Sequence, residues 1–245
     1  MDLLEIKGLC KKYDNREKSV FSDFNFSMKQ GDFIALMGPS GSGKTTLLNL
    51  VSAIEKVDQG KIQLEGQEIS DFGIQERTLY RRRKIGMVFQ DFHLLDSLNL
   101  HDNIILPMTL WEKDMERIEE RFLEVTKIAG ISELGERYPM EVSGGERQRA
   151  AICRALMNEP KLLLADEPTG NLDRKTARSI MEYFQTIYKK SSILMVTHDA
   201  YAASFSKRVL FLEDGIIVKE LQRTGTRKEF FVTILTAMTE REVEE

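Results

Sequence analysis

The chain lacks several features that would place it among disulfide-rich, metal-clustered or membrane-spanning proteins. Its 245 residues include two cysteines, Cys10 and Cys153, which are too few and too far apart in sequence for a disulfide framework or a metal cluster. We therefore expect two reduced cysteines that contribute to packing. No apolar run reaches the roughly eighteen residues that a membrane-spanning helix needs. Residues 1–7 are mixed and acidic, unlike a secretory signal.

An excess of one charge sign is also missing. The 35 basic and 39 acidic side chains leave a net charge of −4, which gives no general reason to expect a nucleic-acid partner. Residues 81–84 form one local basic run, which we interpret as the solvated end of a helix rather than as a nucleic-acid patch. The length suits one large α/β domain or a domain with an inserted subdomain.

Residues 38–46, which read Gly-Pro-Ser-Gly-Ser-Gly-Lys-Thr-Thr, are the strongest feature that is present. They contain the phosphate-binding pattern Gly-x4-Gly-Lys-Thr. An apolar run at residues 33–37 predicts a buried strand before it, and residues 46–51 predict a helix after it. This setting favours a P-loop over a chance glycine-rich turn, with backbone N–H groups facing phosphates, a charge from Lys44 and a hydroxyl from Thr45 for Mg²⁺. The predicted nucleotide contacts in this loop are Gly38, Pro39, Ser40, Gly41, Ser42, Gly43, Lys44, Thr45 and Thr46.

Strand patterns surround the P-loop. Residues 3–9, 24–28 and 61–65 alternate apolar and polar side chains, which predicts half-exposed strands in an antiparallel layer. Residues 162–165 and 192–197 are short and mostly apolar, as buried strands of a parallel core sheet are. The predicted fold class is therefore α/β.

Residues 90–158 lose the strand alternation and take on helical spacing. We interpret this segment as a helical subdomain inserted between the P-loop strand system and the next core strand. Apolar residues at intervals of three and four predict one packing stripe on a charged helix. The stripe consists of Met115, Ile118, Phe122, Val125 and Ala129.

Ser143 and Glu146 have the spacing of a capping box, so Ser143 should begin a helix that continues through Leu156. Gly144 and Gly145 leave the backbone bare at the positive end of this helix, which makes an anion site. Because the P-loop already holds its own nucleotide, this second phosphate-binding helix start indicates a nucleotide presented by another copy of the chain.

Acidic residues follow the buried run at 162–165. Asp166, at the carboxyl end of a parallel strand beside a P-loop, is placed to hold Mg²⁺ directly or through water. Glu167 is then free to polarise an attacking water. His198 follows a strand of the same type, so we expect it in the site rather than in a structural role.

The end of the chain predicts a hairpin and a helix. Residues 209–212 and 216–218 flank Glu-Asp-Gly, a hairpin signal. A helix after residue 225 should dock on a protein surface, and the acidic residues 239–245 should fray. The apolar face of that helix consists of Phe230, Phe231, Ile234, Leu235 and Met238.

Together these motifs resemble the ATP-binding subunits of ABC transporters over essentially the whole chain. Val142 and Glu146 depart mildly from the commonest Leu-Ser-Gly-Gly-Gln of that family's signature, and neither change removes a phosphate contact. The elements that match in type and order are Tyr13, the P-loop, Gln90, the signature at 143–147, Asp166 with Glu167, Asp173 and His198.

The resemblance implies an ATPase that uses ATP and Mg²⁺, with a P-loop NTPase fold of the ABC type. Residues 1–89 and 159–225 would form the RecA-like ATP-binding core with its antiparallel β layer. Residues 90–158 would be the inserted helical subdomain that carries the signature, and residues 226–245 a C-terminal amphipathic helix and tail.

The resemblance also implies a homodimer that closes head to tail around two ATP molecules. Each ATP would lie between the P-loop of one copy and residues 143–146 of the other, with Tyr13 stacked on adenine and Asp173 at the subunit seam. The implied catalytic residues are Lys44, Gln90, Glu167 and His198. The implied Mg²⁺ contacts are Thr45, Gln90 and Asp166.

Residues 89–95 and 167–173 resemble the branch of the superfamily that contains MacB, LolD, FtsE and Bce-type ATPases. Residues 198–204 and 220–234 are most similar to Bce-type peptide-antibiotic resistance ATPases. The implied partner is a separate integral membrane permease, with a sensor histidine kinase as a further candidate. The implied location is cytoplasmic, on the inner face of the cell membrane.

Several functions stay open within and outside this branch. Lipoprotein release, macrolide export and cell division are the nearest. A soluble ABC ATPase that acts on nucleic acid or ribosomes is disfavoured, because the chain has one cassette and no heptad arm. A regulator without turnover is disfavoured because Glu167 and His198 are both present.

Overall fold

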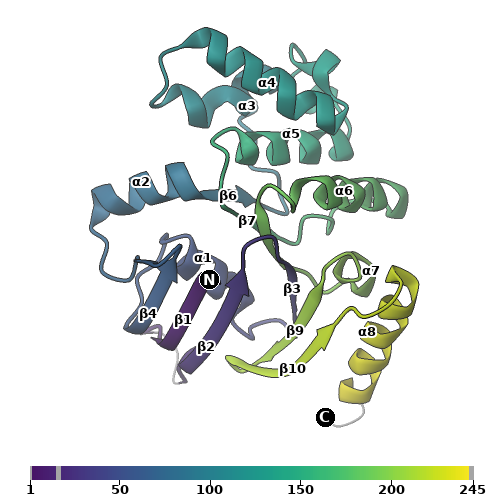
Figure 1. Ribbon diagram of the computed structural model, residues 1–245. Coiled ribbons are helices and arrows are strands. Elements are labelled where there is room, and N and C mark those ends of the chain that lie inside the picture. Colours follow the sequence, from purple (N-terminus) through teal and green to yellow (C-terminus); the bar gives the residue numbers. More distant parts are fainter. Residues whose placement is uncertain (1, 15–17, 243–245) are drawn as a thin grey trace.

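The computed structural model describes residues 2–14 and 18–242. Two sheets lie below a layer of helices (Figure 1). The larger sheet has the strand order β10-β9-β3-β8-β7-β6, and the smaller sheet has the order β2-β1-β4-β5. This arrangement confirms the predicted α/β class.

The P-loop strand β3 (Phe33–Met37) lies inside the larger sheet, between β8 (Ser192–Val196) and β9 (Arg208–Glu213). It pairs in parallel with both neighbours, and β7 (Leu162–Asp166) pairs in parallel with β8 and with β6 (Ile85–Val88). β10 (Ile216–Gln222) is antiparallel to β9, as the hairpin signal predicts. The carboxyl ends of the parallel strands therefore meet at one edge of the sheet, where a ligand site is expected.

Alternate side chains of β3 enter two different hydrophobic cores. Phe33, Ala35 and Met37 pack into the core beneath the helical layer, whereas Ile34 and Leu36 pack into the core shared with the smaller sheet. Every residue of β3 and β8 is buried, because both faces of the larger sheet are covered. This burial on both faces explains why these strands consist mostly of apolar residues.

The smaller sheet is the expected antiparallel layer. β1 (Asp2–Lys11) pairs antiparallel with β2 (Phe21–Lys29) and with β4 (Gln59–Leu64), and β4 continues to β5 (Gln67–Glu68). Buried and exposed residues alternate along much of β2, as on a strand with one solvated face. The first helix, α1 (Lys44–Val51), buries Leu47, Leu48, Leu50 and Val51 in the core shared with this sheet.

The basic run at residues 81–84 forms the last turn of α2 (Ile74–Lys84), as predicted. Cations at a helix C-terminus are favoured by the helix dipole. Tyr80, the buried residue of this helix, donates its hydroxyl to Val51 O at 2.8 Å and so fixes α2 to the end of α1.

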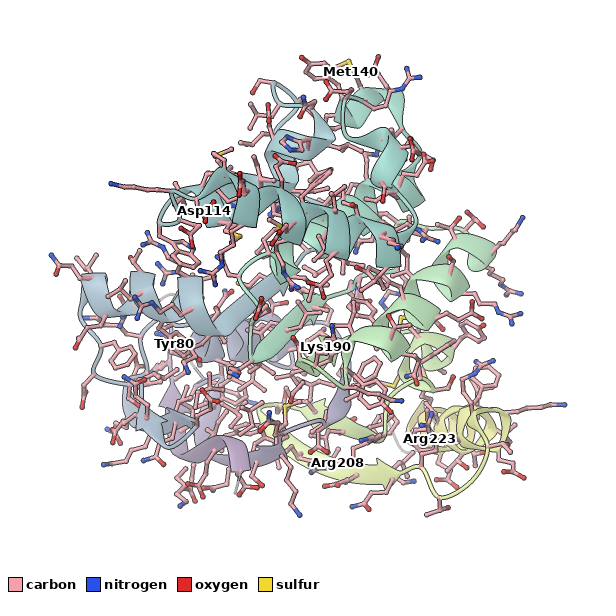
Figure 2. The ribbon with its side chains drawn as sticks, turned by 45° about the horizontal axis from the view of Figure 1, so that its top comes forward. Tyr80, Asp114, Met140, Lys190, Arg208 and Arg223 are labelled. Carbon is pink, nitrogen blue, oxygen red and sulfur yellow. The ribbon has the colours of Figure 1, made fainter. Side chains whose placement is uncertain are left out.

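Three α-helices and two short 3-10 helices occupy the segment that was expected to be helical (Figure 1). Met140, at the outer end of this layer, is 76% exposed (Figure 2). The predicted stripe is correct at Ile118, Phe122, Val125 and Ala129, but wrong at Met115, which is 54% exposed in the first turn. The elements are α3 (Leu100–Thr109), α4 (Met115–Ala129), η1 (Ser132–Leu134), η2 (Pro139–Glu141) and α5 (Gly144–Leu156).

The C-terminal helices follow the core strands. α6 (Arg174–Ile187) precedes β8, α7 (Ala200–Ala203) follows it, and α8 (Arg227–Glu242) packs against α7. The predicted docking face of α8 is correct at Phe230 and Ile234 but wrong at Leu235, which is 41% exposed. Ala237 is buried instead.

α8 continues to Glu242, into the segment from Thr239 that was expected to fray, and the fraying itself stays a prediction. Residues 243–245 lie outside the described part of the chain. Among the helices of the described residues, none combines the length and apolar character needed to cross a bilayer.

Candidate active site

The phosphate-binding loop connects the end of β3 to the start of α1. Gly38 has a φ of 148°, and a Cβ at this position would lie 2.0 Å from Leu212 O on β9. Glycine is therefore required by the close approach of the neighbouring strand, not only by the turn. Helix α1 begins at Lys44, so its unpaired N-terminal N–H groups face the loop.

A cavity of about 580 Å³ opens over this loop. Its volume is in the range of small-molecule sites. The cavity brings the predicted catalytic and magnesium residues from four separate parts of the sequence to one place. It is lined by Gly38, Pro39, Ser40, Gly41, Gly43, Lys44, Thr45, Thr46, Gln90, Asp166, Glu167, Val196 and His198.

Lys44 closes the loop on itself. Its Nζ donates to Gly38 O at 2.9 Å and to Pro39 O at 2.6 Å. Burial lowers the pKa of Lys44, and the nearby carboxylates of Glu167 and Asp166 act in the opposite direction. A partly desolvated ammonium group beside a ring of backbone N–H groups is suited to bind phosphate oxygens.

Thr45 and Asp166 form a second pair in the cavity. The Thr45 hydroxyl donates to Asp166 Oδ2 at 3.1 Å, across the gap between the start of α1 and the end of β7. Burial raises the pKa of Asp166, and the hydrogen bond from Thr45 opposes this rise. Such a half-buried carboxylate gains from a cation nearby.

Glu167 contacts the histidine that follows the neighbouring strand. His198 Nδ1 lies 2.8 Å from Glu167 Oε1, and His198 N donates to Glu167 Oε2 at 3.4 Å. Glu167 has a φ of 47°, in the left-handed region that a non-glycine residue rarely adopts. This conformation turns its carboxylate toward His198, which is the kind of local strain that accompanies function.

Gln90 has a partner that the sequence does not predict. Its Nε2 donates to Asn171 Oδ1 at 3.2 Å, and Asn171 Nδ2 donates to Gln90 O at 3.3 Å and to Asp91 Oδ1 at 3.0 Å. Asn171 thus joins the loop after β6 to the turn before α6. No local pattern signals this pair, because the two residues are far apart in the chain.

The predicted capping box is present at the start of α5. Ser143 Oγ accepts from Glu146 N at 3.4 Å, and Ser143 N donates to Glu146 Oε2 at 2.8 Å. The hydrogen bond from the Ser143 side chain lowers the pKa of Glu146. Residues 143–146 do not line the cavity over the P-loop of their own chain. Their contact with a nucleotide, including that of Glu146, stays a prediction.

Tyr13 also lies outside the residues that line this cavity. Its hydroxyl donates to Glu55 Oε2 at 2.6 Å and lies 3.4 Å from Thr46 Oγ1, so it is anchored next to the P-loop helix. Adenine stacking on this ring stays a prediction.

Asp173 caps α6 on the exposed surface. It accepts from Lys175 N at 2.9 Å, from Thr176 N at 3.2 Å and from Thr176 Oγ1 at 2.5 Å. These bonds, that from the Thr176 hydroxyl above all, lower the pKa of Asp173. The location of Asp173 at a subunit interface stays a prediction.

Comparison with known proteins gives consistent matches. A family model described as ABC transporter matches residues 21–170. The uncharacterized ABC transporter ATP-binding protein YvcR of Bacillus subtilis is 42% identical over 244 residues, covering 97% of this chain and 94% of YvcR. The bacitracin export ATP-binding protein BceA of Halalkalibacterium halodurans is 38% identical over 240 residues, covering 96% of this chain and 95% of BceA.

A solved structure matches the chain as well. The dimeric ATP-binding cassette MJ0796 of Methanocaldococcus jannaschii, in a post-hydrolysis state bound to ADP and Pi, superimposes with a TM-score of 0.82. It is 35% identical in sequence and covers 91% of this chain and 100% of the cassette. The fold is therefore shared with a cassette whose structure was solved with ADP and Pi bound.

Proposed function

The chain belongs to the family of ABC transporter ATP-binding proteins, and from this premise we propose that two copies close head to tail around two ATP molecules to drive a separate membrane permease. ATP binding and hydrolysis are the activity of this family. The observation that supports the closure is the separation of two phosphate-binding features within one chain. The cavity over the P-loop contains no residue of the signature segment at 143–146. A second copy can supply it.

Each residue of the site has a separate role in the proposed hydrolysis. Glu167 orients the attacking water and accepts its proton as oxygen attacks the γ-phosphorus and the bond to the β-phosphate oxygen breaks. Lys44 and His198 stabilise negative charge on the transferring phosphoryl group. The contact between His198 and Glu167 fixes the positions of these two side chains relative to each other. Gln90 lines the same cavity and helps to place the water.

We expect Mg²⁺ to bind in this cavity together with ATP. The Thr45 hydroxyl and the Asp166 carboxylate are 3.1 Å apart in the cavity, and the Gln90 side chain lines the same space. Oxygen donors of this kind suit Mg²⁺, which is commonly held by a few protein oxygens and substrate phosphates. When bound, the ion neutralises charge on the β- and γ-phosphates.

Peptide-antibiotic resistance is the function that we propose for the complete transporter. The supporting observation is the near full-length similarity to the bacitracin export protein BceA. In this proposal the chain works on the inner face of the cell membrane, bound to an integral permease. A sensor histidine kinase as a further partner rests on the family resemblance alone.

The hydrolysis mechanism is tested by Glu167→Gln. This protein should bind ATP, form a dimer that light scattering detects, and turn over ATP at least about a hundredfold more slowly, because a positioned general base typically contributes that much or more. Lys44→Ala is the matched control, which should lose nucleotide affinity. Turnover at the parent rate in Glu167→Gln would refute the role of Glu167.

The transport function is tested in the native host. Cells whose chain carries Glu167→Gln should become more sensitive to bacitracin, measured as the minimal inhibitory concentration, with an unchanged response to a macrolide. Greater sensitivity to the macrolide alone would favour macrolide export. Without antibiotic sensitivity, a septation defect would favour a role in cell division, and a lipoprotein-sorting defect would favour lipoprotein release.

A further inference from the structure

Helices α5 and α6 are fastened together along their length by three contacts, each about one helical turn from the next. α5 begins with the signature segment, and α6 begins directly after Asp173. The residues involved are Gly145, Arg149 and Cys153 on α5, which face Thr176, Ser179 and Tyr183 on α6. Residues three and four apart lie on one face of a helix, so each set forms one continuous row.

The first contact joins the signature to Asp173. A Cβ on Gly145 would lie 2.3 Å from Thr176 Cγ2, so the start of α5 rests directly on α6. The Thr176 hydroxyl in turn donates to Asp173 Oδ2 at 2.5 Å. The two segments that the proposed dimer needs at its interface are thus in contact through one threonine.

The second contact joins three helices. The guanidinium of Arg149 donates to Ala129 O at the end of α4 and to Ser179 Oγ on α6. Arg149 is the central residue of the row on α5. A planar guanidinium can bridge two acceptors in a fixed geometry, which the single ammonium group of a lysine cannot reproduce.

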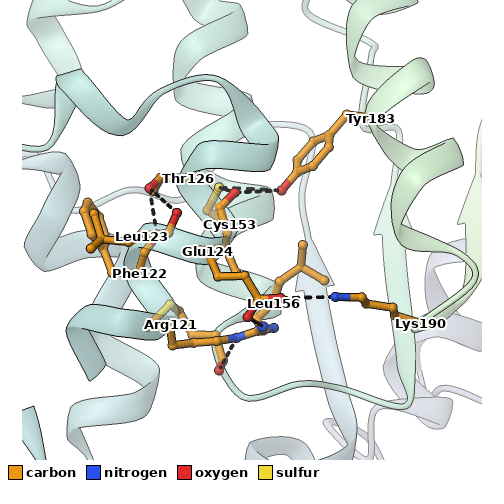
Figure 3. A network of polar contacts seen from close by, with 11 residues as sticks. Arg121, Phe122, Leu123, Glu124, Thr126, Cys153, Leu156, Tyr183 and Lys190 are labelled. Carbon is orange, nitrogen blue, oxygen red and sulfur yellow. Dashed lines mark hydrogen bonds and ion pairs between the residues drawn. The ribbon is translucent and has the colours of Figure 1, made fainter. Parts of the chain in front are cut away.

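The third contact, drawn in Figure 3, joins two buried side chains. Cys153 Sγ lies 3.8 Å from the Tyr183 hydroxyl, which donates to Val125 O on α4 at 3.3 Å. Burial raises the pKa of the Cys153 thiol to about 12 and also raises the pKa of Tyr183. Both groups are therefore neutral at physiological pH, and this contact contributes packing rather than charge.

We propose that Arg149 is a positioning residue of the ATPase. By holding α5 against α6 and α4, it sets where residues 143–145 meet the nucleotide of the second copy. This inference rests on the proposed head-to-tail dimer. Arg149 does not line the cavity over its own P-loop. Its loss should therefore impair the partner's site and leave binding at its own P-loop intact.

The first test compares Arg149→Met with two other variants. We expect kcat of Arg149→Met to fall at least about tenfold, because small misplacements of a positioned group cost this much or more. The affinity of its own P-loop for a fluorescent ADP should not change. Arg149→Lys keeps the positive charge and can still donate to one of the two acceptors, so it should lose less activity. Arg178→Met, which removes a surface arginine paired with Glu182 at 2.8 Å, should match the parent. Equal kcat in Arg149→Met and the parent would refute the proposal.

The second test asks which site Arg149 serves. An excess of Lys44→Ala protein is added to Arg149→Met protein, so that most Arg149→Met chains are in mixed dimers. One site of each mixed dimer is then intact, because the Arg149→Met chain supplies its P-loop and the Lys44→Ala chain supplies its signature helix. We expect ATPase activity above the sum of the two separate proteins. A melting temperature near that of the parent would show that each variant is folded.

A control pair separates this inference from the dimer on which it rests. Lys44→Ala mixed with Gly145→Asp tests the head-to-tail arrangement directly, because these changes disable the P-loop and the signature. Rescue in the control pair but not with Arg149→Met would show that Arg149 acts on its own copy, and would overturn the inference alone. No rescue in either pair would overturn the proposed dimer and the inference together.

Discussion

Glu167 occupies a sharp bend at the end of β7. Its backbone N donates to Val196 O at 3.0 Å, which continues the pairing with β8, while its φ of 47° departs from the strand. The combination places a carboxylate at the edge of the sheet without giving up the backbone pairing. Left-handed backbone in a non-glycine residue costs about 1–3 kcal/mol, which the surrounding strands must offset.

The residue-scale prediction concerns the anchor of Tyr13. Glu55 accepts hydrogen bonds from the Tyr13 hydroxyl at 2.6 Å and from Asn49 Nδ2 at 2.9 Å. If Tyr13 stacks on adenine, Glu55→Ala should weaken ATP binding by about 1 kcal/mol, or roughly fivefold, because a charge-assisted bond that orients the ring is lost. Isothermal titration calorimetry would measure this change.

Inorganic triphosphate provides the control for this prediction. It reaches the P-loop but has no base, so Glu55→Ala should leave its affinity unchanged. Tyr13→Phe should act through the same bond, and the double variant should be no weaker than Glu55→Ala alone. An equal loss for ATP and triphosphate would instead place the effect of Glu55 on the P-loop helix.

At the residue scale, the sequence predicts those site residues that lie directly beside a recognisable strand or helix. Lys44, Asp166, Glu167 and His198 each follow a strand or open a helix, and those elements are visible in short patterns. Asn171 and Arg149 could not be found in this way. Their roles depend on which loops and helices lie side by side, and this is set by packing across distant parts of the chain.

At the scale of helices, His101 joins α3 to α4. Its ring nitrogens lie 3.1 Å from Asp102 Oδ1 and 2.9 Å from Glu119 Oε1, and its ring packs edge-on against Phe122 at a centroid distance of 4.6 Å. Burial of the imidazole acts to lower the pKa of His101, but the hydrogen bonds and charges of Asp102 and Glu119 outweigh it. The net result is a raised pKa.

This raised pKa predicts a pH-dependent contribution to stability. The contribution is fully present below the unfolded-state value of about 6.5, and is lost as the pH rises through the folded-state value. His101→Gln should therefore lower the free energy of unfolding more at about pH 5.5 than at about pH 8.5. We expect a difference of about 1 kcal/mol or less, because both carboxylates are half-exposed.

Thermal melts of both proteins across this pH range would measure the effect. Asp102→Asn and Glu119→Gln should each remove part of the pH dependence. A cost of His101→Gln that is independent of pH would mean that the ring contributes through its packing on Phe122 alone.

The ends of helices show where sequence patterns stop being informative. Periodicity identified α4 and α8, but it assigned Met115 and Leu235 to buried faces that they do not occupy. Met115 lies in the first turn, beside the N-cap Asp114, where the neighbouring helices no longer cover the stripe. Along α8, the face is set by contact with α7, which brings the small Ala237 inward.

At the scale of the whole molecule, the proposed dimer predicts a dependence on protein concentration. A site made by two copies should be almost idle in a monomer, so ATPase activity per chain should rise with concentration until the dimer is saturated. Steady-state assays over a dilution series, with saturating ATP, would measure this. Activity per chain that stays constant on dilution into the monomeric range, as judged by light scattering, would contradict the prediction.

The central strand has a consequence for the synthesis of the protein. β3 carries the phosphate loop, but both strands that flank it, β8 and β9, come from the last quarter of the chain. Leu212 O, against which Gly38 packs, is also made late. During translation, the residues of the P-loop are therefore synthesised well before the two strands that flank β3. The loop should therefore take its final shape, and bind nucleotide, only after β8 and β9 have been synthesised.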